Sequence, residues 1–128
     1  MRKYVLIGCG GFLGAVARYW ARDMGSDLYW GVIPLSILLV NLLGAFLLAF
    51  LLTFANEIRP FSTDLRLGLS AGFLGAFTTF STLCKEAVGL MQVGDFSASA
   101  VYLTASVILG LSSAYVGVAA ARRLGRER

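Results

Sequence analysis

Hydroxyl and glycine residues gather in one short apolar stretch, "GFLGAFTTFSTLCKE", residues 72–86. Gly72 and Gly75 precede a group in which phenylalanines alternate with hydroxyls: Phe77, Thr78, Thr79, Phe80, Ser81 and Thr82. Hydroxyls and backbone carbonyls can replace the water around a small ion, but carbonyls become free only where a helix is interrupted. The stretch therefore predicts one of two structures. Either a broken helix binds ions, or an intact helix bonds its hydroxyls back to its own carbonyls.

Two other apolar runs also carry polar groups. Asn41 lies near the middle of a long run, where its amide needs partners in a neighbouring helix or in a ligand. On the last run, Tyr102 and Ser106 share one helical stripe with Gly110, Ser113 and Gly117. This stripe indicates either a polar track or helix packing. No carboxylate lies deep in a run, which argues against proton-coupled transport.

The composition identifies the solvent as lipid. Of 128 residues, 58% are hydrophobic and only 14% are charged, and the mean hydropathy is +0.78. A soluble domain of this size could not bury so much apolar surface. Histidine is absent and only two cysteines occur, so neither a catalytic triad nor a zinc site can be assembled, and we expect no enzyme. The net charge of +4 comes largely from a C-terminal arginine cluster, and we expect no nucleic-acid partner.

The elements that must position these residues are membrane helices. Uncharged runs of 29, 18 and 26 residues follow Asp27, Arg66 and Asp95, and about 20 apolar residues cross a bilayer. A shorter first run reaches that length if Arg18 lies near the interface. We predict a single all-α membrane domain over residues 1–128, with spans at roughly 4–22, 32–55, 67–91 and 98–121.

Glycine spacing and charge then suggest how the spans are arranged. Gly10/Gly14 and Gly68/Gly72 have the four-residue spacing that lets membrane helices approach closely. With four spans, eight Lys and Arg residues lie on the side of the termini and three on the other, which favours cytoplasmic termini. Without the C-terminal arginines the count is four to three, so insertion in both orientations stays open.

Three segments together resemble the bacterial fluoride channel family, Fluc or CrcB. They are "GGFLGAVARYW" in the first span, "PLSILLVNLLGAF" in the second and "GFLGAFTTFSTLCKE" in the third. The resemblance extends over essentially the whole chain and implies a channel that exports fluoride from the cytoplasm through the bacterial inner membrane. It further implies an antiparallel, dual-topology homodimer with a broken third helix, two pores and a central sodium ion.

The same resemblance assigns roles to individual residues. The carbonyls of Gly75 and Thr78 would hold the sodium ion. Arg18 would lie near the vestibule, and Glu86 matches the acidic residue that closes the third motif. The pore would be lined by Asn41, Phe80, Ser81, Thr82, Leu83, Tyr102 and Ser106.

Leu83 departs from the family pattern, which usually has a second phenylalanine at this position. Leucine has no polar ring edge, so the paired-phenylalanine site is incomplete and we expect anion coordination or conduction to be altered. Two alternatives stay open on the residues alone. One is a small dual-topology exporter of drugs or cations, and the other is a membrane assembly subunit that transports nothing.

Overall fold

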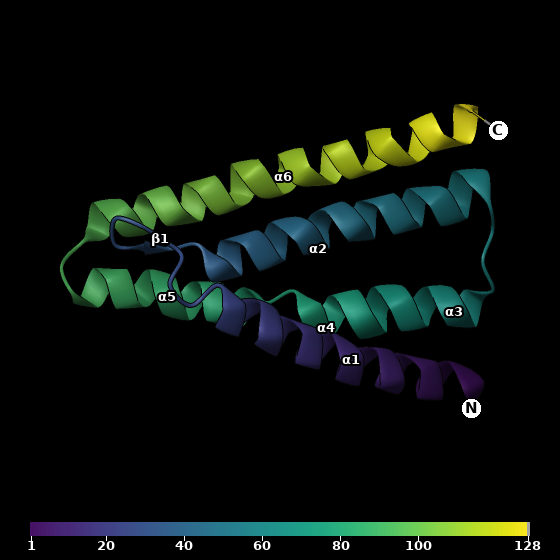
Figure 1. Ribbon diagram of the computed structural model, residues 1–128, viewed down its shortest axis with the longest axis horizontal. Coiled ribbons are helices and arrows are strands. Elements are labelled where there is room, and N and C mark those ends of the chain that lie inside the picture. The colour runs from purple at the N-terminus through teal and green to yellow at the C-terminus, as the bar shows by residue number, and fades with distance from the viewer. Residues whose placement is uncertain (128) are drawn as a thin grey trace.

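The computed structural model describes residues 1–127 and contains four helical spans, each antiparallel to the one before it in the chain (Figure 1). The first span is α1 (Arg2–Met24), and the second joins α2 (Ser36–Thr53) to a π-helical segment, η1 (Phe54–Ile58). All four are long and apolar enough to cross a membrane, as predicted. The third span contains α3 (Thr63–Leu67), π-helical η2 (Gly68–Leu74), α4 (Gly75–Phe77) and α5 (Phe80–Gln92). The fourth is α6 (Phe96–Arg126).

The second span begins later than predicted. Residues 32–35, which we assigned to a helix, instead belong to a small hairpin and its exit. Strand β1 (Tyr29–Trp30) pairs antiparallel with β2 (Ile33–Pro34), and Gly31 turns the chain at φ +61°. That dihedral favours glycine, and Pro34 cannot donate a helical hydrogen bond, so the helix begins only at Ser36.

Side-chain caps set the starts of the later helices. The Ser62 side chain accepts from the N–H of Leu65 at 3.3 Å, so α3 begins four residues before the predicted boundary. The Asp95 carboxylate accepts from the N–H of Ala98 at 2.9 Å and begins α6. Each cap satisfies one of the N–H groups that have no partner within their own helix.

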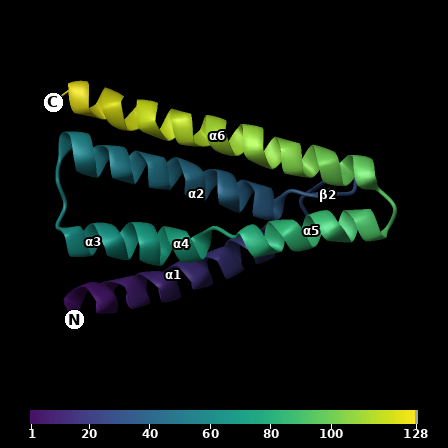
Figure 2. The same ribbon diagram turned by 180° about the vertical axis from the view of Figure 1, so that it is seen from behind.

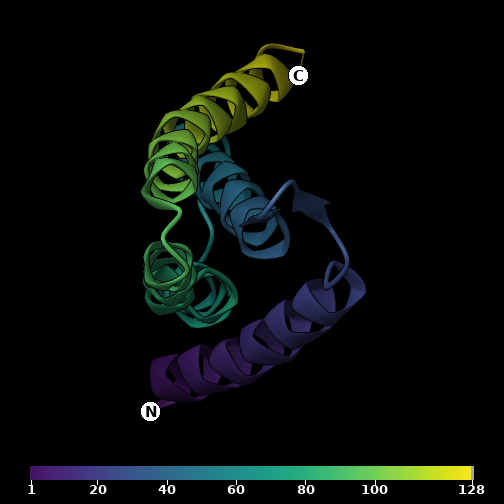
Figure 3. The same ribbon diagram turned by 90° about the vertical axis from the view of Figure 1, so that its left-hand side faces the viewer.

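The spans lie in the order α6, α2, third span, α1, with both termini at one end (Figures 1 and 2). Seen from one end of the bundle, α6 lies next to α2, while α1 lies apart from α6 and packs mainly along the first half of the third span (Figure 3). The two halves of the third span therefore have different neighbours.

The glycine seam, formed by Gly10, Gly14, Gly68 and Gly72, joins α1 to the first half of the third span. A Cβ added at Gly10 would overlap the Gly68 carbonyl oxygen, and one at Gly72 would lie 2.6 Å from the Ile7 carbonyl oxygen. The backbones are thus in direct contact, which confirms the close approach that the spacing predicts.

The second half of the third span packs by side chains instead. One buried apolar cluster joins α5 to β2, α2 and α6: Ile33, Ile37, Leu38, Leu83, Ala87, Leu90, Ala98 and Tyr102. On α6, Gly117 lies against the backbone of Phe46 and Phe50 in α2, whereas Gly110 has no such neighbour among residues 1–127. The stripe on α6 therefore serves packing at Gly117 but not at Gly110.

Candidate functional site

The helix of the third span is interrupted at two adjacent threonines in mid-span. After α4 ends at Phe77, Thr78 has φ −76° and ψ 156°, and Thr79 has φ −148° and ψ 124°. Both pairs of angles are extended rather than helical. Helix α5 begins at the next residue, Phe80.

Hydrogen bonds at these threonines leave particular carbonyls without their helical donors. The N–H of Thr79 donates to Asn41 Oδ1 at 2.8 Å, although in a continuous helix it would donate to the Gly75 carbonyl. The N–H of Thr82 donates to Thr79 Oγ1 at 3.2 Å, although in a continuous helix it would donate to the Thr78 carbonyl. The Gly75 and Thr78 carbonyls lose their helical donors in this way, and the break at Thr78 and Thr79 leaves the Ala76 and Phe77 carbonyls without helical donors as well.

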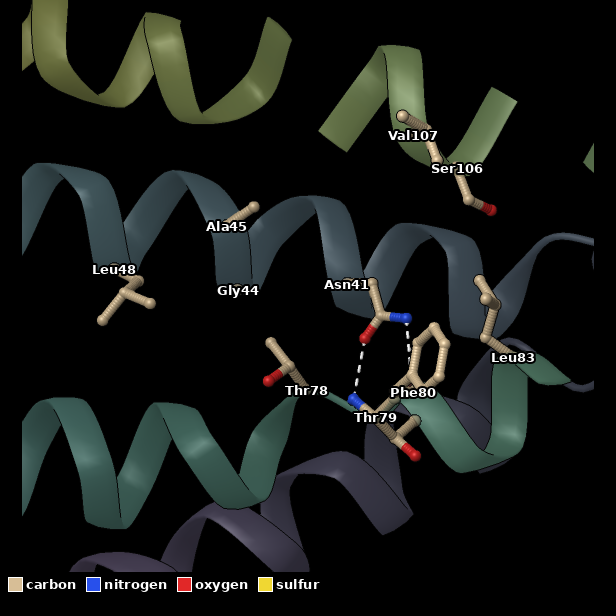
Figure 4. Close-up of a pocket in the computed structure, with 10 residues that line it drawn as sticks. All are labelled: Asn41, Gly44, Ala45, Leu48, Thr78, Thr79, Phe80, Leu83, Ser106 and Val107. Atoms are coloured by element: carbon tan, nitrogen blue, oxygen red, sulfur yellow. Dashed lines mark hydrogen bonds between the residues drawn. The ribbon is translucent and has the colours of Figure 1, made fainter. Parts of the chain in front are cut away.

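Asn41 joins the second span to this point through a reciprocal pair of bonds. Besides accepting from Thr79, its Nδ2 donates to the Thr79 carbonyl at 2.9 Å (Figure 4). Thr79 is buried, so both of its backbone groups need partners inside the protein. Asn41 is therefore a clamp between two spans, and one hydrogen of its amide is left over from this pair.

The reciprocal pair lies at the edge of an open groove of about 410 Å³. The groove is mainly apolar, and its lining comes from α2, the third span and α6 (Figure 4): Asn41, Gly44, Ala45, Leu48, Thr78, Thr79, Phe80, Leu83, Ser106 and Val107. Phe80 is 79% exposed, whereas Leu83 is only 7% exposed and belongs to the apolar core. The groove thus brings together five of the predicted residues: Asn41, Thr78, Phe80, Leu83 and Ser106.

The ends of α4 and α5 give the groove two kinds of polar backbone. The N–H groups of Phe80 and Ser81 begin α5, so they have no acceptor within that helix and its end carries partial positive charge. The carbonyls that end α4 carry the opposite partial charge. Within residues 1–127, no three His, Cys, Asp or Glu side chains gather to ligate a metal.

The hydroxyls of the third span bond to one another beside Thr79. Thr79 Oγ1 lies 3.3 Å from Ser81 Oγ and donates to Thr82 Oγ1 at 3.1 Å. Thr78 Oγ1 donates back to the Leu74 carbonyl at 3.0 Å. The hydroxyls thus stabilise the extended residues and the start of α5.

Tyr102 and Glu86 lie away from the groove lining and bond to each other. The Tyr102 hydroxyl donates to Glu86 Oε2 at 2.6 Å, and the tyrosine is fully buried. Ser106, which does line the groove, donates to the Tyr102 carbonyl at 2.7 Å. The structure therefore places Tyr102 behind the groove wall, in contact with Ser106 through the backbone.

Arg18 reaches the threonines from the opposite side. Its Nη1 donates to the Thr78 carbonyl at 3.4 Å. Arg18 also lines a second cavity of about 300 Å³, together with Ala15, Tyr19, Arg22, Ile37 and Thr82. Our sequence reasoning missed the contact with Thr78, and the positive charge that interrupts the first apolar run was the only sign of it.

Comparison with known proteins identifies the family of the chain. A family model described as "CrcB-like protein, Camphor Resistance (CrcB)" matches residues 5–118. A "Fluoride-specific ion channel FluC" from Nitratidesulfovibrio vulgaris is 38% identical over 122 residues, which cover 95% of this chain and 98% of the relative. A protein of the same name from Dehalococcoides mccartyi is 39% identical, over 91% of this chain and 90% of its own length. "Fluoride-specific ion channel FluC 1" from Bacillus anthracis is 36% identical, over 91% and 87%. Matches of this extent, together with four helices of spanning length, show that the chain is a multi-pass membrane protein and belongs to the CrcB-like family.

Proposed function

We propose that the protein is a fluoride-specific channel that lets fluoride leave the cytoplasm through the bacterial inner membrane, down its electrochemical gradient. The observation that carries the proposal is the exposure of Phe80, an aromatic ring in mid-span, in a groove beside the start of α5. Three relatives named as fluoride-specific channels support it. Their names favour conduction over both alternatives, the exporter and the assembly subunit, and they give no support to an enzyme.

Three kinds of donor in the groove suit a small anion. They are the N–H groups that begin α5, the remaining amide hydrogen of Asn41, and the positive edge of the Phe80 ring. Fluoride would exchange its water for these donors and for the nearby hydroxyls of Ser81 and Thr82. The Ser106 hydroxyl would have to release the Tyr102 carbonyl before it donates to fluoride. Tyr102 would act indirectly, by fixing Ser106. Leu83 completes an apolar wall and offers no ring edge of its own.

The open groove supports a dimer. An ion path cannot face lipid, so the groove needs a second wall. A second copy of the chain in antiparallel orientation would supply it and would create two equivalent pores. Such a homodimer requires dual topology, with each chain inserted in both orientations.

A broken third helix with a sodium ion at the dimer centre completes the proposal. The Gly75 and Thr78 carbonyls are the ones whose helical donors bond elsewhere, and carbonyl oxygens are suitable ligands for a hard cation. The ion would hold the two interrupted helices together across the interface.

Fluoride efflux from proteoliposomes tests conduction. We expect rapid fluoride release and no comparable chloride release from the native protein. The Phe80→Ile variant should lose most of the fluoride flux, whereas Phe12→Ile should keep it, because Phe12 is a similarly exposed ring on α1, away from the groove. Equal passage of chloride, or native flux in Phe80→Ile, would contradict the proposal.

Labelling of a single cysteine tests the orientation. In a variant whose two natural cysteines are replaced, Ser26→Cys places a thiol in the exposed loop after α1. An impermeant maleimide added outside sealed cells should label about half of the chains. Labelling of all or of none would refute dual topology while leaving the flux result unaffected.

A further inference from the structure

Arg18 donates to one of the carbonyls that lose their helical donors, that of Thr78. Its Nη1 lies 3.4 Å from the Thr78 oxygen, across sixty residues of sequence. Thr78 and Arg18 are both half-buried, so the contact is only partly screened by water. A guanidinium therefore lies on the oxygen that the proposed function assigns to a cation.

The glycine seam accounts for the reach of Arg18. Gly14 brings the backbone of α1 into contact with the backbone of Phe73. Arg18 is one turn further along α1 and on the same face, since residues four apart align along a helix. Its side chain thus starts from a close backbone approach and extends to the end of α4.

No carboxylate offsets the charge of Arg18 where it lies. The cavity around it is lined by a second arginine, Arg22, and by apolar and hydroxyl side chains. Within residues 1–127, the structure contains a single ion pair, between Arg122 and Glu57 at the far end of the molecule. Among these residues, then, no carboxylate lies within ion-pair distance of Arg18.

We propose that Arg18 is a positioning residue that competes with the cation for the Thr78 carbonyl and so sets the affinity of the cation site. This inference rests on the proposed cation site. The guanidinium keeps the extended residues in place before a cation binds, because it gives the freed carbonyl a donor. Once a cation shares that oxygen, two positive charges lie close together and repel each other, which weakens cation binding.

Sodium-dependent unfolding tests this inference. Purified protein is dialysed free of sodium and fluoride, and its thermal unfolding is followed as sodium replaces N-methylglucamine at constant ionic strength. A cation that binds only the folded protein raises the unfolding temperature. The sodium midpoint is the sodium concentration that gives half of the full rise in unfolding temperature. We expect this midpoint to be about tenfold lower in Arg18→Gln and Arg18→Met than in the native protein. A change of this size corresponds to a modest charge repulsion at a half-buried site.

Two variants serve as controls. Arg22→Gln removes a positive charge from the same cavity without touching Thr78, so it should leave the sodium midpoint close to the native value. Arg18→Lys keeps the charge and should shift the midpoint less than either neutral variant. Fluoride efflux is measured on the same preparations.

The possible outcomes separate the inference from the proposed function. An unchanged or higher sodium midpoint in the neutral Arg18 variants, or an equal shift in Arg22→Gln, overturns the inference while the cation site stands. A native protein that sodium does not stabilise overturns both the cation site and the inference. If the native protein conducts no fluoride but the sodium midpoints shift as expected, the proposed channel function is refuted and the inference about Arg18 stands.

Discussion

The two halves of the third span are held in different ways. The half from α3 to α4 lies along α1 at the glycine seam, where backbone meets backbone. Helix α5 packs instead through Leu83, Ala87 and Leu90 in a cluster with α2 and α6. The extended residues Thr78 and Thr79 lie at the boundary, where the packing partner of the span changes. The interruption is therefore held from two sides: by the seam with α1, from which Arg18 reaches it, and by the packing with α2, from which Asn41 reaches it.

The half of the third span from α3 to α4, which lies at the glycine seam, should tolerate added atoms less well than α5. A Cβ at Gly14 would overlap the Phe73 carbonyl oxygen, so Gly14→Ala forces two backbones apart. We expect it to lower the free energy of unfolding by about 3 kcal/mol, at the upper end for overpacking, because no flexible side chain can yield. Thermal unfolding in detergent measures this. Gly8→Ala on the same helix is the control, since nothing lies within 4 Å of an added Cβ there. Equal loss in both variants would contradict the seam.

The junction between the halves should depend on the amide of Asn41. Asn41→Leu leaves the N–H and the carbonyl of Thr79 without their partners. We expect the free energy of unfolding to fall by about 2 kcal/mol, because buried unpaired backbone groups are costly. We also expect nearly all of the fluoride flux from proteoliposomes to be lost. Asn41→Asp retains the acceptor for the Thr79 N–H and should therefore be less destabilised. Native stability in Asn41→Leu would show that the clamp is unnecessary.

The stability of the half formed by α5 and its apolar cluster should fall less when one polar contact is lost. Tyr102→Phe removes the 2.6 Å bond to Glu86 but keeps the ring in the apolar cluster. The expected cost is about 1 kcal/mol, the usual contribution of one hydrogen bond, as measured by thermal unfolding. Tyr115→Phe on the same helix should be silent, because Tyr115 is exposed. If Tyr115→Phe were more destabilising than Tyr102→Phe, the assigned role of the bond to Glu86 would be refuted.

An ion pair outside both halves should matter least. Arg122 donates to both carboxylate oxygens of Glu57, at 2.8 and 2.9 Å, but both side chains are exposed. We expect Glu57→Gln to lower the unfolding temperature slightly at low salt and not at high salt, since exposed pairs are screened. A salt-independent loss would indicate that the pair is buried in an interface.

The local sequence was sufficient to predict the number of spans, their approximate bounds and the close approach of Gly10 and Gly14 to Gly68 and Gly72, but not that Gly110 would lack such a neighbour. Spanning length and glycine spacing are properties of single helices in a bilayer of known thickness, so short segments determine them. The start of α2 was misjudged because apolar composition alone cannot distinguish the Tyr29–Pro34 hairpin from a helical turn. The family resemblance suggested which residues matter, but not what each one contacts.

Only the tertiary structure decided the partners at the interruption. Asn41 and Thr79 are 38 residues apart, and Arg18 and Thr78 are 60 apart, so their bonds depend on which helices become neighbours. The same holds for Tyr102, whose hydroxyl meets Glu86 behind the groove rather than within it. Polar residues at bilayer depth must find partners, and the sequence alone determined that requirement. Which partners they find depends on packing, because a hydrogen bond forms only between groups that the fold brings within hydrogen-bonding distance.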